Sequence, residues 1–208
     1  MTFVQDTRDL IASRMITTKD TGRFAWLRKN TGTAAGGGAA SAKSILDVGC
    51  FDGEMFKDHP PAMYMGVDSF GGRKTNRILP EQIESVKHAM RGRRFVISDA
   101  GFLPFKDNTF DAVVCAEVLE HIWAPVQALQ EAVRAAKNGG IILITVPDEF
   151  NWTAELTPFA HYGHMHFFND YTIVSLIREA VGSRVQIEEF IHDFCGFVFY
   201  YVKLRKGT

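Results

Sequence analysis

Apolar runs of strand length alternate with segments of helical spacing through most of the chain. Two segments have apolar residues three and four positions apart, Pro80–Met90 and the stretch from Pro125 to Ala136, where Asn138-Gly139-Gly140 should end the helix. The strands that we predict around these helices are Ser44–Val48, Ala62–Asp68, Arg94–Ser98, Phe110–Cys115 and Ile141–Val146. Strands joined by helices indicate a mainly parallel, doubly wound α/β sheet.

The last part of the chain departs from this alternation. Asn169 or Asp170 can cap one more helix, whose apolar positions end before Gly182. Two strands, Val185–Ile191 and Phe197–Leu204, then follow each other across a link that is long enough only for a hairpin. We therefore predict a seven-stranded sheet that ends in a C-terminal antiparallel hairpin.

Residues 1–42 differ in composition from the rest. One or two short helices are predicted within residues 1–30, and the Gly-, Ala-, Ser- and Thr-rich stretch Thr31–Ala42 is typical of a flexible connector. We expect residues 1–42 to be an accessory segment of the same domain, or a lid on it, and residues 43–208 to be the main domain.

Length and charge restrict the function classes. The 208 residues suit one domain, and a formal net charge of −1 gives no overall basic footprint of a nucleic-acid binder. The three cysteines lie far apart and form no CxxC pair, which favours a reducing compartment. The N-terminal segment lacks a signal-peptide core, and no apolar run is long enough to span a membrane. We expect a cytoplasmic protein with no membrane partner.

The most informative stretch is SILDVGCFDGEMF, residues 44–56. A buried strand there turns tightly at glycines into a helix start, which is a backbone arrangement suited to close approach of a ligand. DVGCFDG resembles the first motif of the Rossmann-like S-adenosylmethionine-dependent methyltransferases, usually acid-x-Gly-x-Gly-x-Gly, with Phe51 in place of the middle glycine. FDAVVCAEVLEHI (110–122) resembles the fourth-strand region of the same family, and the matches extend over about residues 44–147.

The resemblance implies a cofactor, S-adenosyl-L-methionine, and a place for each of its parts. Asp47 would bind the methionine ammonium, directly or through water, and the loop to Gly53 would hold the methionine end. Asp68, which follows Asp47 by 21 residues, would bind the ribose diol, as a strand-end carboxylate can. The full set of cofactor-binding residues that we expect is Asp47, Gly49, Cys50, Phe51, Gly53, Asp68, Ser69, Phe70, Asp99, Ala100, Ala116 and Glu117.

Structural roles remain open for several of these side chains. Asp47 could cap the following helix, and Asp99 could belong to a simple turn. We assign Asp111 to structure, and we expect Glu120 and His121 to pack around the loop that follows the fourth predicted strand. Cys50 and Cys115 are interpreted as small apolar fillers, because two thiols without further ligands make a poor metal site. No metal site is predicted.

The acceptor should lie after the fifth predicted strand, between Pro147 and Asp170. This segment is rich in aromatic and histidine residues, which suits an apolar pocket with a few polar groups. His161 or His164 could act as the catalytic base near neutral pH. HMHFFND resembles a segment that follows the fifth strand in many small-molecule methyltransferases, so a small-molecule acceptor is expected.

Two alternatives remain. RNA or protein could be the acceptor, and a basic cluster within residues 71–94 would suit phosphate contact. A non-catalytic subunit that binds S-adenosylmethionine is also compatible, because Phe51 departs from the family loop. A nicotinamide oxidoreductase is disfavoured, since GCFDG is not GxGxxG and the C-terminal hairpin does not suit that fold. The sequence does not define the acceptor atom or the oligomeric state.

Overall fold

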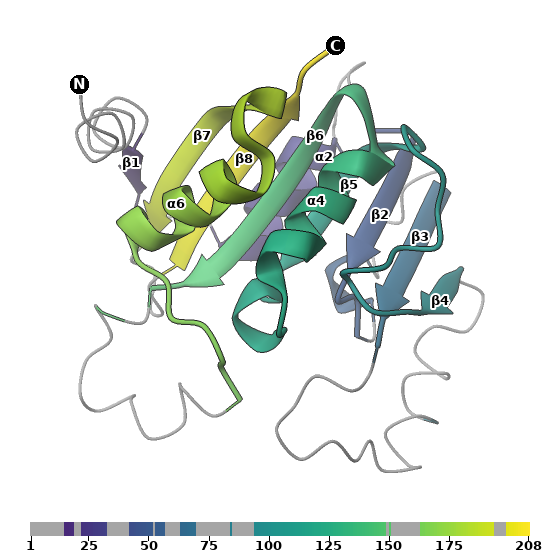
Figure 1. The fold of residues 1–208 in the computed structure, drawn as a ribbon, viewed down its shortest axis with the longest axis horizontal. Helices are drawn as coiled ribbons and strands as arrows, with labels where there is room; N and C mark the ends of the chain where they lie inside the picture. The colour runs from purple at the N-terminus through teal and green to yellow at the C-terminus, as the bar shows by residue number, and fades with distance from the viewer. Residues whose placement is uncertain are drawn as a thin grey trace.

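The protein folds around one mixed sheet of eight strands (Figure 1), in the order β1-β7-β8-β6-β5-β2-β3-β4. This computed structural model describes residues 15–18, 22–32, 42–51, 53–56, 63–69, 84, 94–148, 150, 163–193 and 199–208. The strands are β1 (Met15–Thr18), β2 (Ser44–Val48), β3 (Met63–Asp68), β4 (Phe95–Ile97), β5 (Phe110–Ala116), β6 (Ala136–Pro147), β7 (Val185–Asp193) and β8 (Phe199–Lys206). The helices are α2 (Arg23–Thr31), α4 (Pro125–Ala135) and α6 (Asp170–Val181), with short 3-10 turns η1 (Glu54–Phe56), η2 (Leu119–His121) and η3 (Gly182–Arg184).

The seven predicted strands and the antiparallel hairpin are confirmed. Strands β4, β3, β2, β5 and β6 are parallel to one another, whereas β8 is antiparallel to both β6 and β7 and lies between them. Strand β1 is an addition that the sequence did not predict. Its four residues pair in parallel with the edge of β7, from Met15 beside Phe190 to Thr18 beside Asp193. A short segment without clear alternation becomes a strand here because β7 offers it an edge.

Helices cover both faces of the sheet, as a doubly wound fold requires. In Figure 1 α4 and α6 lie side by side on the face toward the viewer, and α2 lies behind the sheet. A hydrophobic core lies on each face of the sheet, and alternate residues of β2 contribute to each. Leu46 and Val48 pack with α4 and α6, whereas Ile45 packs with Trp26 and Leu27 of α2. The described part of residues 1–42 therefore packs on the same sheet as the rest of the chain.

Two predicted helix ends have different outcomes. Asn169 caps α6 in a capping box with Thr172, and Gly182 follows its last residue, as predicted. Helix α4 instead ends at Ala135, so Ala136 is not on its buried face and Asn138-Gly139-Gly140 lies within β6. The chain turns directly from helix to strand because Ala136 adopts an extended conformation and pairs with Phe110.

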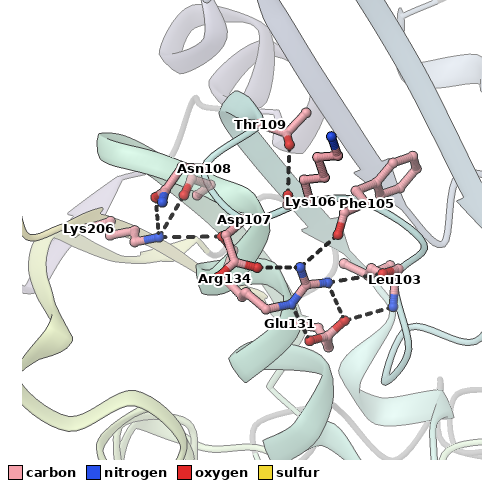
Figure 2. Close-up of polar contacts among 10 residues, drawn as sticks. Leu103, Phe105, Lys106, Asp107, Asn108, Thr109, Glu131, Arg134 and Lys206 are labelled. Carbon is pink, nitrogen blue, oxygen red and sulfur yellow. Dashed lines mark hydrogen bonds and ion pairs between the residues drawn. The ribbon is translucent and has the colours of Figure 1, made fainter.

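A polar cluster fastens the loop before β5 to the end of α4 (Figure 2). The guanidinium of Arg134 donates to both oxygens of Glu131, to the carbonyls of Leu103 and Phe105, and to Asp107. The Leu103 N–H donates to Glu131 Oε2 at 2.8 Å. We call these residues the Arg134 cluster; they hold the amino edge of the sheet, where β5 and β6 begin.

Two predicted features lie outside the described residues: the helix Pro80–Met90, apart from Glu84, and most of the connector Thr31–Ala42. In the parts of the chain that the structure describes, no helix combines the length and apolar character needed to cross a bilayer.

Candidate functional site

The carboxyl ends of β2, β3, β4, β5 and β6 meet along one edge of the sheet. We call it the carboxyl edge. Strand β2 has β3 on one side and β5 on the other, so the strand order reverses at β2. In open α/β sheets, ligands bind in the crevice at such a reversal. The described candidate residues at the ends of β2, β3, β4 and β5 lie on this edge.

The loop after β2 is a tight turn that the neighbouring strand holds. The N–H groups of Gly49 and Cys50 both donate to the Val67 carbonyl of β3, at 2.7 and 3.1 Å. Gly49 has φ +71°, and a Cβ placed there would lie 2.3 Å from Cγ2 of Val118. Glycine is therefore favoured at position 49 for two reasons: the backbone has a positive φ, and a Cβ would clash with Val118.

Phe51, which replaces the middle glycine of the motif, has φ +44° and a side chain that is 49% exposed. Its N–H donates to Oδ2 of Asp68 at 2.9 Å. Non-glycine residues rarely adopt this left-handed conformation, and doing so costs about 1 kcal/mol or more. The hydrogen bond joins the turn after β2 to the carboxylate that ends β3, two sites that sequence analysis assigned to the same ligand.

Asp47 and the two described cysteines lie beneath the turn. Asp47 is 3% exposed and accepts from the Tyr64 hydroxyl at 2.8 Å, so its carboxylate is held inside the fold. Burial, with the charges of Asp47 and Asp68, raises the pKa of the Cys50 thiol, and burial, then Asp47, raises the pKa of Cys115 to about 12. Both thiols stay protonated at neutral pH and belong to cores on opposite faces, which agrees with their interpretation as apolar fillers.

The segment after β4 places Asp99 and Ala100 at the end of the same edge. Asp99 is exposed, and its Oδ1 accepts from the Gly101 N–H at 2.7 Å, so a turn is present there as the structural alternative predicted. Ser69, after β3, is also exposed. Phe70 and His161, both predicted site residues, lie outside the described residues.

Ala116 ends β5 in the middle of the carboxyl edge, and Glu117 follows it. Glu117 has φ +56°, and its side chain accepts from Thr145 Oγ1 at 2.8 Å. Arg23 Nη1 of α2 lies 3.4 Å from Glu117 Oε2. Sequence analysis did not connect Arg23 or Thr145 with the site, because nothing in their local patterns marks them. The structure thus joins α2 to the candidate cofactor loop.

Three side chains that could ligate a metal meet beside Glu117: Glu120 and His121 from η2, and His164. One ligand atom from each lies within 4.8 Å of the others. Glu120 has no exposed surface, and its Oε1 lies 4.0 Å from Nε2 of His121. The rings of His121 and His164 meet edge to face, with centroids 4.6 Å apart. We call these three residues the Glu120 cluster. Sequence analysis predicted no metal site and assigned Glu120 and His121 to packing around the loop.

Backbone contacts hold the His164 segment against η2. The N–H groups of Met165 and His166 both donate to the Glu120 carbonyl, at 2.6 and 3.2 Å. The Nδ1–H of His121 donates to the Gly163 carbonyl at 3.2 Å, and the Nε2–H of His166 donates to the Ile122 carbonyl at 3.0 Å. His166 is therefore engaged with the backbone, whereas His121 and His164 face each other.

A buried polar group that sequence analysis missed closes the end of β6. Asp148 has no exposed surface, and its Oδ2 accepts from His192 Nε2 and from the Tyr200 hydroxyl, both at 2.8 Å. Its Oδ1 accepts from the Phe150 N–H at 3.1 Å. Burial, and then the bond to Asp148, raises the pKa of Tyr200. Asp148 thereby fixes the start of the segment predicted to line the acceptor.

Exposed aromatic side chains follow several strands at the carboxyl edge. They come after β2, β4, β5 and β6 and before α6, and they are Phe51, Phe102, Trp123, Phe150 and Phe167. Trp123 is 88% exposed. Aromatic surface around polar groups is typical of small-molecule sites.

Part of the chain resembles a known family. Residues 46–144 match the family model described as a methyltransferase domain. Among solved structures, N-methyltransferase NodS from Bradyrhizobium japonicum with S-adenosyl-L-homocysteine has a TM-score of 0.59 and 15% identity, and the match covers 91% of this chain and 90% of NodS. The cyclase SpnF has a TM-score of 0.62 and 16% identity, over 99% and 93% of the two chains. At these identities the likeness shows the fold alone.

The similarity to sequence relatives extends over only part of this chain and part of each relative. A tRNA (carboxymethyluridine(34)-5-O)-methyltransferase from Arabidopsis thaliana is 30% identical over 118 residues, which is 55% of this chain and 25% of that protein. Two other curated relatives are matched over 37% and 27% of their own lengths. The chain thus spans well under half the length of these relatives.

Proposed function

We propose that the protein is an S-adenosylmethionine-dependent methyltransferase that transfers a methyl group to a small-molecule acceptor. The observation that carries this proposal is the joined turn at the strand reversal. There the Gly49–Gly53 loop is held on Val67, and its Phe51 N–H reaches the carboxylate of Asp68. The main chain of the loop and the Asp68 carboxylate therefore lie next to each other. A nucleoside with a charged tail could contact both of them.

The side chains at this edge suit the proposed cofactor by charge. Asp47, Asp68, Asp99 and Glu117 lie at the ends of four neighbouring parallel strands. The cofactor carries a positive sulfonium and a positive ammonium, so an acidic edge attracts it. The carboxylates are also spread along the edge, which suits an extended ligand with several polar groups. The donor set therefore fits S-adenosylmethionine.

Each residue has a role in this proposal. Asp68 binds the ribose diol, with Ser69 and Phe70 beside the adenine, while Asp99 and the Ala100 N–H bind the adenine edge. Ala116 and Glu117 pass under the methionine portion, and Glu117 is already held by Thr145 and Arg23. Asp47 is buried and bonded to Tyr64, so it acts on the methionine ammonium through its charge and a water.

For methyl transfer the protein mainly has to align the acceptor with the methyl group of the cofactor. Bound S-adenosylmethionine supplies a methyl group on a sulfonium that is already activated for in-line displacement. The chain must hold the acceptor nucleophile about 3 Å from the methyl carbon, in line with the leaving sulfur, and exclude water. A general base is needed only when the acceptor must lose a proton first. The proposal therefore does not depend on His161 or His164 acting as a base.

A small-molecule acceptor is favoured by the surroundings of the edge. Asp148 holds the segment after β6, the half-buried His164 faces the edge, and aromatic side chains such as Trp123 and Phe167 stand around it. An apolar rim with a few polar groups selects compact organic acceptors. RNA is the second candidate, because one relative acts on tRNA, as its name states.

Binding and turnover test the proposal separately. Calorimetry should give one site for S-adenosylhomocysteine and none for NADH. Asp68→Asn should weaken that binding by about tenfold, since it loses a charged hydrogen bond, whereas Asp107→Asn, at the amino edge, should leave it unchanged. Absence of S-adenosylhomocysteine binding would refute the cofactor assignment.

Transfer from methyl-labelled cofactor to separated metabolite, RNA and protein fractions then identifies the acceptor class. Label in the metabolite fraction is the expected result. Label only in RNA would replace the small-molecule proposal with the tRNA-like one. Binding without label in any fraction would support the non-catalytic subunit.

A further inference from the structure

We infer that the Glu120 cluster is a binding site for a first-row divalent transition-metal cation such as Zn²⁺ or Co²⁺. The inference goes beyond methyl transfer and rests on side chains that the proposed cofactor site does not use. Glu120 and His121 come from η2, and His164 comes from a segment 43 residues further along. Two imidazoles and one carboxylate form a ligand set that suits such ions.

The spacing of the three ligand atoms leaves room for an ion between them. They lie within 4.8 Å of one another, and Oε1 of Glu120 is 4.0 Å from Nε2 of His121. That distance is too long for a hydrogen bond. A point equidistant from three atoms at the full separation would lie about 2.8 Å from each, while metal–nitrogen and metal–oxygen bonds are about 2.0–2.2 Å. Each side chain therefore has to move by less than about 1 Å to bind.

His121 is already oriented as a metal ligand. Its Nδ1–H donates to the Gly163 carbonyl, which leaves the lone pair on Nε2, the nitrogen that faces Glu120. Metal-bound histidines usually donate their other ring N–H to a carbonyl or carboxylate in this way, which fixes the tautomer and the ring. In the neutral ring, the contact thus selects the tautomer whose ligating atom is turned inward.

The backbone supplies the preorganisation that the site needs. The Glu120 carbonyl accepts from the N–H groups of both Met165 and His166, so the residue after His164 is fixed to the residue that supplies the carboxylate. Glu120 is fully buried. A divalent cation bound there would place positive charge directly beside this buried carboxylate, where the low dielectric strengthens the attraction.

Three protein ligands leave one or more coordination positions for another molecule, as in catalytic zinc sites. Glu120 follows Glu117 by three residues at the carboxyl edge, Trp123 follows His121 by two residues, and Phe167 follows His164 by three. A hydroxyl or thiol acceptor bound to the cation would lose its proton more readily. In that role His164 is a ligand and not the base.

The test begins with metal binding by the full chain, without cofactor or acceptor. Protein stripped with a chelator is titrated with Zn²⁺, with Co²⁺ and with Mg²⁺. We expect one equivalent of Zn²⁺ or Co²⁺ to bind, Co²⁺ to give visible absorption bands, and Mg²⁺ to bind at least about tenfold more weakly, since it prefers oxygen ligands.

Variants assign the site. Glu120→Gln and His164→Ala should each weaken Zn²⁺ binding by about 30-fold or more, because each removes one of three ligands. His166→Ala is the matched control, since His166 lies two residues from His164 but binds the Ile122 carbonyl; it should stay within about threefold of the native chain. Zn²⁺ should also raise the melting temperature of the native chain and the control but not of the other two variants.

Three results would overturn the inference: no stoichiometric Zn²⁺ or Co²⁺ binding, binding that survives both ligand substitutions, or equal loss in the His166 control. In the first case the cluster is an ion pair of Glu120 with a protonated His121. Circular dichroism of the apo variants separates loss of ligands from loss of fold. Because the titration needs no S-adenosylmethionine, its failure would leave the methyltransferase proposal intact.

Discussion

The two edges of the sheet differ in the residue types that adopt the unfavourable left-handed backbone conformation. Among the described residues, the non-glycine residue with positive φ at the amino edge is Asn108, at +55°, and its side chain accepts from Lys206 Nζ at 2.9 Å. At the carboxyl edge the residues with positive φ that are not glycine are Phe51 and Glu117. Asparagine tolerates this region better than phenylalanine or glutamate does. Strain is thus placed where a ligand would bind, which is common at functional sites.

The glutamates of the two edges show the same contrast. Glu131 of the Arg134 cluster accepts from the guanidinium at 2.6 and 2.7 Å, and this hydrogen bonding holds the pKa of its carboxyl below the usual value. Glu120 is more deeply buried, and its Oε1 lies 4.0 Å from Nε2 of His121. The glutamate of the amino edge is thus held by a direct guanidinium contact, whereas Glu120 and His121 are spaced as two ligands around a metal ion could be.

The largest expected loss of stability comes from a substitution within the carboxyl edge. Gly49→Ala should destabilise the protein by about 2–4 kcal/mol, because it adds both left-handed strain and a clash with Val118. Gly139→Ala is the control: Gly139 has φ +73° but nothing within 4 Å of its added Cβ, so only about 1 kcal/mol should be lost. Denaturant unfolding measures both. Equal losses would show that the Val118 contact relaxes freely.

Arg134→Ala should break the amino edge by a slightly smaller amount. The substitution removes hydrogen bonds to Glu131, Leu103, Phe105 and Asp107, and we expect a loss of about 2–3 kcal/mol. Arg134→Lys should recover only part of it, since lysine lacks the planar fork. Binding of S-adenosylhomocysteine to the folded variant should not change. A large loss of affinity would mean that the two edges are coupled.

The pH dependence of stability sharpens the contrast. Because the folded pKa of Glu131 is depressed, its contribution is complete above the unfolded value of about 4.5 and is lost as pH falls through the lower folded pKa. The free energy of unfolding should therefore decline on acidification more in the native chain than in Glu131→Gln. Urea unfolding between about pH 7 and pH 3 measures this. Parallel curves for the two proteins would contradict the prediction.

The smallest effect concerns the strained positions themselves. Phe51→Gly should change stability by no more than about 1 kcal/mol, in the stabilising direction, because relief of strain offsets the added freedom of the unfolded chain. Phe51→Val should cost about 1 kcal/mol or more, since a β-branched residue fits left-handed backbone poorly. Asn108→Gly should stay within about 0.5 kcal/mol. Thermal melts of the three variants against the native chain test the order.

The fold was largely accessible from sequence because its signals are local. Ser44–Val48, the Asn169 cap and the Gly182 stop each depend on neighbouring residues, and the structure has them where they were predicted. Strand β1 and the start of β6 at Ala136 were missed, because both become strands only by pairing with distant segments. The placement of Asp68 and Asp99 on one edge followed from parallel topology alone.

The contacts within the site were less accessible. Glu120 and His164 lie 44 residues apart, and they meet because Met165 and His166 donate to the Glu120 carbonyl. The buried group of Asp148, His192 and Tyr200 likewise joins three strands. Neither association leaves a mark in residue spacing.

The position of β8 between β6 and β7 has a consequence for synthesis on the ribosome. Strands β2 to β6 can pair with one another as they emerge, since each has at least one partner among the strands that end by residue 147. Strand β7 emerges with only β1 to pair with, and it joins β6 only when Phe199–Lys206 arrives to fill the gap. The nascent chain therefore completes its sheet late. Until then the edges of β6 and β7 that will pair with β8 remain unpaired, and unpaired strand edges favour aggregation and chaperone binding.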